Sequence, residues 1–176
     1  AAVSALENGA KKVVILEKLG YLGGSTNVSG GALNAVDDKR QKAQGIEDSV
    51  QKFYEATMKG GHNVGNPELV KYLTDNAYPT VKWMEKEGVV FRDKIGAATG
   101  SLGQRSHYGK KPAGYAYTSV FENKLKEYGD RVVVLTETPA TKLIMDKSGR
   151  VIGVSGLHAG KQPVTVMAPS VILATG

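Results

Sequence analysis

The sequence contains no cysteine. This absence excludes disulfide bridges, thiolate metal ligands and cysteine nucleophiles, and it is compatible with a cytoplasmic or a periplasmic location. No apolar run approaches the ~18 residues that a membrane-spanning helix needs. The G-x-S-x-G motif of many hydrolases is also missing, and no two histidines stand at metal-ligand spacing with a carboxylate. We therefore expect no membrane span in this segment, no hydrolase and no metal site.

Positive charge is in excess but is not concentrated. Lysine and arginine number 23 against 17 acidic residues, which gives a formal net charge of +6. Nucleic-acid-binding proteins commonly gather such charge on one face or along one helix. Here the lysines are scattered along predicted helices among acidic residues, and no basic stripe with interleaved aromatics appears apart from the short pair Lys110 and Lys111. This pattern indicates solvated helix faces and no nucleic-acid partner.

Glycine is abundant, at 22 of 176 residues, against about 7% in a typical protein. Such an excess marks backbone that turns sharply or approaches a ligand closely, and it favours a ligand-binding α/β protein. Residues 1–10 have the pattern of the last turns of a helix with a stop at Gly9, and residues 12–17 form a β-branched run typical of a buried parallel strand. Together they match the second half of a βαβ unit. We expect the first half, with its phosphate-binding G-x-G-x-x-G turn, to precede Ala1.

The remaining patterns predict an α/β fold: a parallel sheet with flanking helices and an antiparallel β-meander over about residues 135–168. Strands 13–16 and 171–173 are expected in one parallel sheet, because both are β-branched runs that end at a polar or glycine turn. Pro79 should kink or split a helix, and residues 146–149 should form a hairpin turn. Helices are expected at residues 46–59, 67–87 and 114–128, strands at 132–135, 140–146, 151–158, 164–168 and 171–174, and a polar loop at 95–113.

Glu17 is the first candidate for binding chemistry. An acidic residue at the carboxyl end of the second strand of a βαβ unit can accept hydrogen bonds from both ribose hydroxyls of a dinucleotide. The alternative is a surface glutamate that ends a strand before Lys18. Six residues later, two glycine pairs bracket small polar residues that could approach a pyrophosphate or a planar ring. This run reads Gly23-Gly24-Ser25-Thr26-Asn27-Val28-Ser29-Gly30-Gly31.

These motifs resemble the fumarate reductase and succinate dehydrogenase flavoprotein family, most closely its soluble branch of flavocytochrome c and urocanate reductases. The resemblance covers essentially the whole chain. It rests on the runs Ile15-Leu16-Glu17-Lys18, Gly23-Gly24-Ser25-Thr26, Ser29-Gly30-Gly31, Met58-Lys59-Gly60-Gly61-His62-Asn63, Val81-Lys82-Trp83-Met84, Gln104-Arg105-Ser106-His107 and Val171-Ile172-Leu173-Ala174-Thr175-Gly176.

The resemblance implies a Rossmann-like FAD-binding domain with FAD as cofactor. Glu17 would bind the adenosine ribose, Ala140 would meet the adenine through its backbone, and Lys18 is a further implied cofactor-binding residue. The other implied cofactor-binding residues are Gly23, Gly24, Ser25, Thr26, Ser29, Gly30 and Gly31, at the pyrophosphate and isoalloxazine, and Thr175 and Gly176 in the final strand signature.

The resemblance also implies an oxidoreductase that passes a hydride from reduced flavin to the C=C bond of a small dicarboxylate-like substrate such as fumarate. It does not identify the electron donor. We expect residues 1–176 to form a partial FAD-binding domain, with the catalytic residues and the substrate-capping domain after Gly176, so that this segment alone would be inactive. The alternatives are a ketosteroid dehydrogenase or an aspartate oxidase of the same superfamily, or a non-catalytic flavin- or nucleotide-binding module.

The three histidines carry less weight. His62 and His107 lie in predicted loops from which either could approach substrate or flavin, but a histidine in such a loop is more often a bystander. His158 lies in a predicted hairpin strand, where we expect a structural role. Trp83 and Met84 lie on a predicted helix and are expected in the core.

Overall fold

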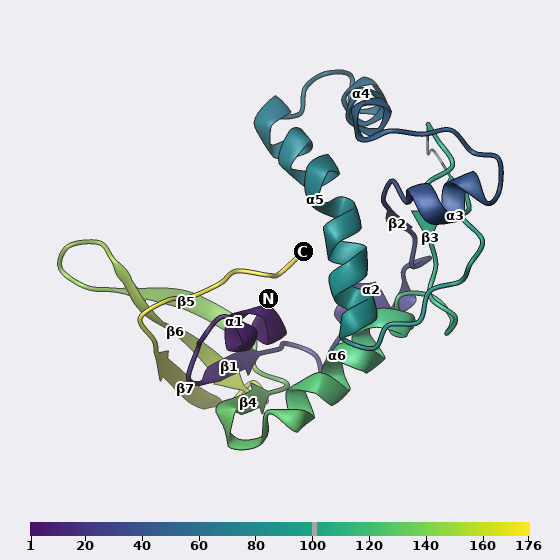
Figure 1. The fold of residues 1–176 in the computed structure, drawn as a ribbon. Helices are drawn as coiled ribbons and strands as arrows, with labels where there is room; N and C mark the ends of the chain where they lie inside the picture. Colours follow the sequence, from purple (N-terminus) through teal and green to yellow (C-terminus); the bar gives the residue numbers. More distant parts are fainter. Residues whose placement is uncertain (100–101) are drawn as a thin grey trace. The chain divides into compact units, whose positions relative to one another are not determined.

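The computed structural model describes residues 1–99 and 102–176. The chain divides into two compact units (Figure 1). The first comprises Ala1–Gly24 and Phe121–Gly176, and the second comprises Ser25–Val120.

The first unit contains the expected helix and parallel strand pair. Helix α1 (Ala2–Glu7) buries Val3 and Leu6. Strand β1 (Val13–Leu16) follows it and pairs in parallel with β4 (Val132–Leu135), in a continuous register from the first residue of each strand to the last. Because the two strands are parallel, their carboxyl ends lie at the same edge, which is where sheets of this kind place their ligands.

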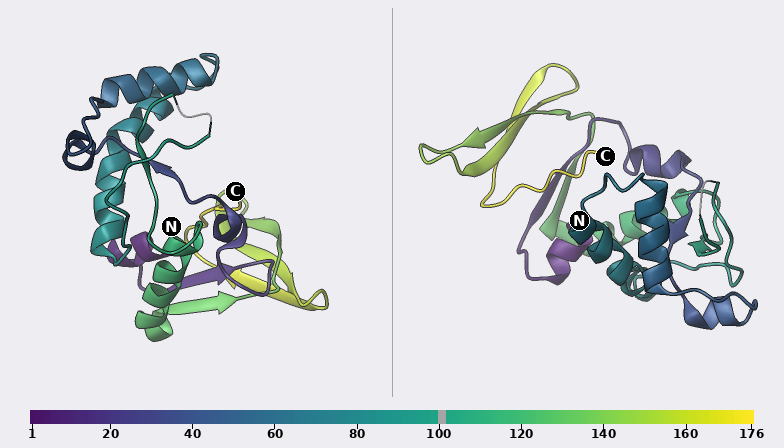
Figure 2. Two further views of the ribbon diagram at one scale, coloured as in Figure 1. Left: turned by 90° about the vertical axis from the view of Figure 1, so that its right-hand side faces the viewer. Right: turned by 90° about the horizontal axis from the view of Figure 1, so that it is seen from above.

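An antiparallel meander completes the first unit (Figure 2). Strands β5 (Ala140–Met145), β6 (Val151–His158) and β7 (Gln162–Met167) pair in chain order. The Asp146 carboxylate accepts hydrogen bonds from backbone amides in the β5–β6 turn. Gly149 supplies the left-handed residue of that turn, with φ of 84°. The predicted meander and hairpin are therefore confirmed, as is the mixed α/β fold class.

The expected final strand is wrong. Residues 171–174 form no strand, and the parallel sheet in the described part of the chain consists of β1 and β4 alone. The side chains of Ile172 and Leu173 are 64% and 67% exposed. A β-branched run becomes a strand only when a neighbouring backbone pairs with its amide and carbonyl groups. This run forms no such ladder with the described residues.

The second unit is mostly helical. Its helices α3 (Asp38–Lys42), α4 (Val50–Gly60) and α5 (Pro67–Lys86) have side-chain caps from Asp37, Ser49 and Asn66. A cap of this kind satisfies amides that the first turn of a helix leaves without partners. Helix α5 continues through Pro79, so the proline does not split it, and the expected kink stays a prediction. A proline removes one amide donor, and the remaining turns keep their hydrogen bonds.

The second unit also contains most of α2 (Gly24–Val28), strands β2 (Leu33–Asn34) and β3 (Ser106–His107), and the first part of α6 (Tyr115–Glu127). The rest of α6 and the 3-10 helix η1 (Gly129–Arg131) belong to the first unit. Strands β2 and β3 pair in antiparallel fashion inside the second unit.

The predicted polar loop at 95–113 is more ordered than expected. Ile95 is fully buried, Gly96 pairs with Ser106, and β3 lies in the core. Residues 100 and 101 of this loop lie outside the described residues. On α5, Met84 is buried and Trp83 is half-buried, in agreement with the expected core positions.

Candidate functional site

The carboxyl ends of β1 and β4 are joined by backbone hydrogen bonds beyond the strands themselves. The amide of Glu17 donates to Leu135 at 2.9 Å, and the amide of Thr138 donates to the carbonyl oxygen of Glu17 at 2.8 Å. The amide of Glu137 donates to Leu19 at 2.9 Å. Segments 120 residues apart in the sequence thus form one continuous edge.

Glu17 contributes its carboxylate to this edge. Its Oε1 accepts a 2.7 Å hydrogen bond from the amide of Leu19, which holds the half-buried side chain in place. Within the described part of the chain, Oε2 accepts no hydrogen bond, so it can accept one from a ligand hydroxyl. Lys18 is exposed beside it. The geometry suits a ribose contact at Glu17, although the contact itself remains a prediction.

Ala140 lies at the same edge. It is exposed and begins β5 two residues after Thr138, whose fully buried side chain donates from Oγ1 to the carbonyl of Thr136 at 2.7 Å. Glu137, which lies between Thr136 and Thr138 in this turn, adopts a left-handed φ of 49°. The structure therefore brings Glu17 and Ala140, the two residues assigned to the adenosine, close to one anchored turn.

The glycine- and serine-rich run forms short helix α2 and the coil after it. Ser25, Thr26 and Ser29 are exposed in the second unit, and the hydroxyl of Ser29 donates to the carbonyl of Thr26 at 2.8 Å. A Cβ at Gly30 would meet no described atom within 4 Å. Exposed hydroxyls and open backbone are compatible with a ligand surface here.

Gly31 has a second explanation. Its φ is 70°, and a Cβ there would lie 2.7 Å from the backbone of Ala113. A Cβ on Gly114, the residue that follows Ala113, would lie 1.8 Å from the carbonyl oxygen of Thr26. The hydroxyl of Tyr117 donates to the carbonyl of Gly31 at 2.5 Å. Close backbone packing inside the second unit therefore accounts for this glycine without a cofactor.

The remaining predicted cofactor residues belong to the first unit. Gly23 and Gly24 adopt φ of 97° and 42°, and a Cβ at Gly24 would enter open space with respect to the described residues. Thr175 and Gly176 are exposed in coil. Their predicted strand does not form, so the structure brings neither residue to the β1–β4 edge through sheet pairing.

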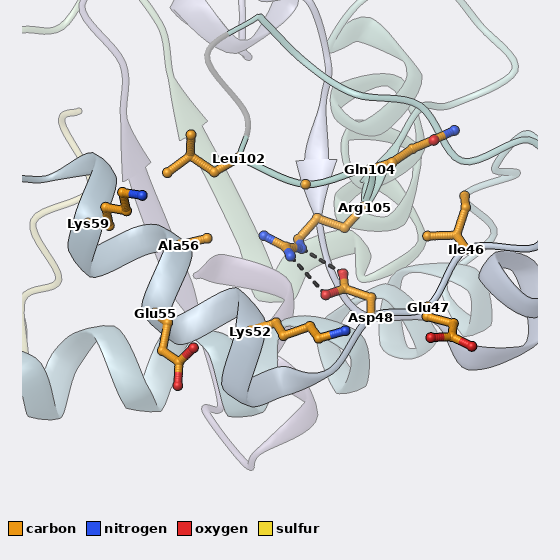
Figure 3. Close-up of a pocket in the computed structure, with 11 residues that line it drawn as sticks. Ile46, Glu47, Asp48, Lys52, Glu55, Ala56, Lys59, Leu102, Gln104 and Arg105 are labelled. Atoms are coloured by element: carbon orange, nitrogen blue, oxygen red, sulfur yellow. Dashed lines mark hydrogen bonds and ion pairs between the residues drawn. The ribbon is translucent and has the colours of Figure 1, made fainter.

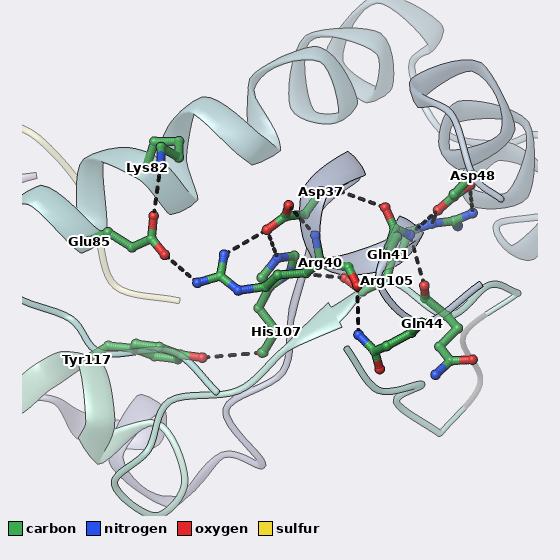
Figure 4. A network of polar contacts seen from close by, with 11 residues as sticks. Asp37, Arg40, Gln41, Gln44, Asp48, Lys82, Glu85, Arg105, His107 and Tyr117 are labelled. Atoms are coloured by element: carbon green, nitrogen blue, oxygen red, sulfur yellow. Dashed lines mark hydrogen bonds and ion pairs between the residues drawn. The ribbon is translucent and has the colours of Figure 1, made fainter. Parts of the chain in front are cut away.

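The most buried polar cluster in the second unit was not anticipated from the sequence (Figure 4). Fully buried Asp37 accepts from the Arg40 guanidinium at 2.7 Å and lies 3.3 Å from Nε2 of His107. Arg40 also donates to Glu85 on α5 at 2.6 Å. The Nδ1 atom of His107 lies 3.3 Å from the carbonyl of Arg105. These contacts tie α3, α5 and β3 together.

Electrostatics keep this cluster ionised. Burial alone would raise the pKa of Asp37, but hydrogen bonds from the side chain and amide of Arg40, and from His107, bring that pKa below its ordinary value. Burial likewise opposes ionisation of Glu85, yet its hydrogen bond with Arg40 lowers the pKa of the Glu85 carboxyl. Such charge-assisted bonds are characteristic of a structural network as well as of a functional site.

A hollow of about 450 Å³ in the second unit adjoins a second ion pair (Figure 3). Asp48 and Arg105 both line it and are bonded to each other at 2.8 Å, and Gln41 donates to Asp48 at 3.0 Å. The hollow is also lined by the exposed lysines Lys52 and Lys59 and by aliphatic atoms. Its strongest polar groups bind one another, so it offers no evident ligand chemistry.

His107 and His158 contact groups of their own units, as a structural role requires. His107 is fully buried, with both ring nitrogens near acceptors of its own unit. His158 contacts Thr138 and Thr136 inside the first unit. His62 is exposed, with a left-handed φ of 52°. Residues 1–99 and 102–176 contain no group of three or more side chains that could hold a metal ion, and none of their helices is long and apolar enough to cross a membrane.

Comparisons with known proteins agree on one family. A family model described as an FAD binding domain matches residues 1–176. The cytochrome-type fumarate reductase of Shewanella frigidimarina is 35% identical over 181 residues, which cover 100% of this chain and 30% of that protein. The urocanate reductase of Eggerthella lenta is 36% identical over 179 residues, which cover 100% of this chain and 29% of that protein.

Solved structures show the same similarity. The open conformation of a flavocytochrome c3 fumarate reductase matches with a TM-score of 0.84 and 25% identity, over 98% of this chain and 35% of that one. The chain thus spans less than a third of the length of each of these curated relatives.

Proposed function

We propose that this chain, which belongs to the family of FAD-binding domains, contributes the adenosine-binding edge of a flavin-dependent oxidoreductase. The observation that carries the proposal is the joined edge of β1 and β4. There the Glu17 carboxylate keeps one oxygen open, and the backbone of Thr138 fixes the loop that holds it.

The residues of the edge suit an adenosine chemically. A carboxylate at the end of a parallel strand accepts hydrogen bonds from the ribose hydroxyls, and its charge disfavours a phosphorylated ribose. Ala140 is exposed and has only a methyl side chain, so a purine ring can approach its backbone closely. In the second unit, the hydroxyls of Ser25 and Thr26 are proposed to donate hydrogen bonds to the cofactor, with Gly30 leaving room for close approach. The Ser29 hydroxyl already donates to the Thr26 carbonyl, so it would donate to the cofactor only by giving up that bond.

FAD, when bound, supplies the hydride chemistry, and the residues of this chain would bind and orient the cofactor. Two of the similar proteins are a fumarate reductase and a urocanate reductase. Fumarate and urocanate both carry a C=C bond conjugated to a carboxylate. We therefore propose an unsaturated carboxylic acid, of fumarate-like size, as the substrate of the intact protein, with the acid or base that acts on it outside the residues assigned here.

The test uses the intact protein loaded with FAD. Its flavin is reduced under anaerobic conditions and mixed separately with fumarate, urocanate and a 3-ketosteroid, and reoxidation is followed by flavin absorbance. Rapid reoxidation by an unsaturated acid supports the proposal. Reoxidation by the steroid alone would assign the protein to the ketosteroid branch, and failure to retain FAD would favour a module with another ligand.

A further inference from the structure

The end of strand β6 is hydrogen-bonded to the turn that carries the proposed adenosine edge. The amide of Leu157 donates to the carbonyl of Pro139 at 3.3 Å, and the amide of Ala159 donates to the carbonyl of Glu137 at 2.8 Å. A Cβ at Gly156 would lie 2.6 Å from the carbonyl oxygen of Pro139, so only glycine allows this approach without a shift.

His158 provides the side-chain contact between β6 and this turn. Its Nδ1 atom lies 3.0 Å from Oγ1 of Thr138 and 3.2 Å from the carbonyl oxygen of Thr136. The Thr138 hydroxyl has one hydrogen, and it donates that hydrogen to the Thr136 carbonyl at 2.7 Å. Both oxygens near Nδ1 can therefore only accept. A hydrogen on Nδ1 of His158, donated to this pair of threonines, is the arrangement that satisfies all three groups at once.

The threonines transmit this contact to the binding edge. The backbone amide of Thr138 holds the carbonyl of Glu17. Glu137, between the two threonines, has a left-handed φ of 49°, a conformation that a residue with a Cβ keeps only when its surroundings impose it. Without the His158 donor, the turn keeps the hydrogen bond from Thr138 to Thr136 but loses its side-chain link to β6, so the turn that holds the Glu17 carbonyl is less firmly fixed.

We propose that His158 is a positioning residue for adenosine binding: through Nδ1–H it fixes the turn of residues 136–138 and so sets the position of the Glu17 loop. This inference rests on the proposed FAD-binding function. His158 acts through Thr138 and does not itself contact the cofactor.

The experiment compares two substitutions in the intact apo-protein by titration with FAD. Asparagine places its amide NH₂ close to the position of Nδ1. Leucine removes the donor but still fills much of the space that the imidazole occupies. His158→Leu should weaken FAD binding by about fivefold to tenfold, as expected for a lost intramolecular hydrogen bond, and His158→Asn should stay within about twofold of wild type. Ser155→Ala, on the same strand but outside the turn, is the matched control and should bind as wild type does.

Two results would overturn the proposal: equal affinity of His158→Leu and wild type, or equal loss in His158→Leu and His158→Asn. If His158→Leu fails to fold, nitrogen-15 NMR of the wild-type holoprotein decides instead. The proposal requires the hydrogen of His158 on Nδ1, and a neutral ring with its only hydrogen on Nε2 would contradict it. Glu17→Gln distinguishes a failure of the positioning role of His158 from a failure of the proposed FAD-binding function. If Glu17→Gln weakens FAD binding and His158→Leu does not, only the positioning role fails. If the wild-type protein binds no FAD, the proposed function itself fails.

Discussion

Asp48 and Arg105, 57 residues apart in the sequence, form a two-bonded ion pair in which both N···O distances are 2.8 Å. Each side chain is only 5% exposed. The Arg105 guanidinium also lies over the Phe53 ring at 4.8 Å, and Gln41 adds a hydrogen bond to the Asp48 carboxylate. This pair therefore connects the start of α4 to the segment before β3.

Removal of one partner of this pair should destabilise the protein strongly. Arg105→Met leaves the Asp48 carboxylate buried without its counter-ion, which typically costs about 3–5 kcal/mol. The free energy of unfolding in urea at neutral pH would measure the loss. Lys52→Met is the matched control, because Lys52 lines the same hollow but is exposed. It should change stability by less than about 0.5 kcal/mol. Equal losses in both variants would contradict the importance of the pair.

Acid should destabilise the second unit through protonation of the Asp48 carboxylate. Burial opposes ionisation of Asp48, but hydrogen bonds from Arg105, Gln41 and the Ser49 amide lower the pKa of Asp48 below its ordinary value. A lowered folded-state pKa contributes stability above the unfolded-state pKa, and this contribution is lost as pH falls through the folded-state pKa. Stability should therefore fall below about pH 4.

The acid prediction is checked with unfolding free energies at pH 6 and at pH 3. Asp48→Asn cannot gain a proton at this position as pH falls, so it should lose less stability between the two pH values than wild type does. The control is Asp38→Asn, whose side chain is 69% exposed in the native protein and which should follow wild type. An Asp48→Asn variant with the full wild-type loss would remove Asp48 from the explanation.

Two glycines of the second unit should respond oppositely to alanine. At Gly114 a Cβ would lie 1.8 Å from the Thr26 carbonyl oxygen, whereas at Gly30 it would meet no described atom within 4 Å. Gly114→Ala should therefore destabilise by at least about 1–3 kcal/mol through overpacking, and Gly30→Ala should stay within about 0.5 kcal/mol of wild type. Thermal unfolding of both variants measures the contrast. A neutral Gly114→Ala would show that the contact of residue 114 with the Thr26 backbone relaxes easily.

The sequence predicted the parallel β1, the meander and the main helices because each has a local signal. Periodic apolar residues, a Pro67 helix start and an Asp146 turn depend on neighbours a few residues away. The failure at residues 171–174 has the opposite cause. Whether that β-branched run becomes a strand depends on a partner backbone, which composition alone does not reveal.

The site shows the same division. Glu17 was proposed as a binding residue because a carboxylate after a buried strand is a local pattern, and that role stays a prediction. The ion pair of Asp48 with Arg105 and that of Arg40 with Glu85 join residues 57 and 45 positions apart, and no local pattern encodes such pairing. The role of Gly31 was ambiguous for a related reason: a glycine required by a neighbouring backbone looks the same in sequence as one required by a cofactor.

The decisive change for the proposed function is Glu17→Gln in the intact protein. Glutamine keeps the oxygen that accepts from the Leu19 amide at 2.7 Å, so the loop should retain its fold while the charge at the edge disappears. FAD affinity should then fall by about 1–3 kcal/mol, the usual loss for a charge-assisted hydrogen bond. Titration of apo-protein with FAD measures the change. Glu137→Gln is the control, since this exposed neighbour makes no side-chain bond within the described residues, and it should alter affinity by less than about 0.5 kcal/mol. Equal FAD affinity in Glu17→Gln and wild type would return Glu17 to the role of a surface residue at the end of a strand.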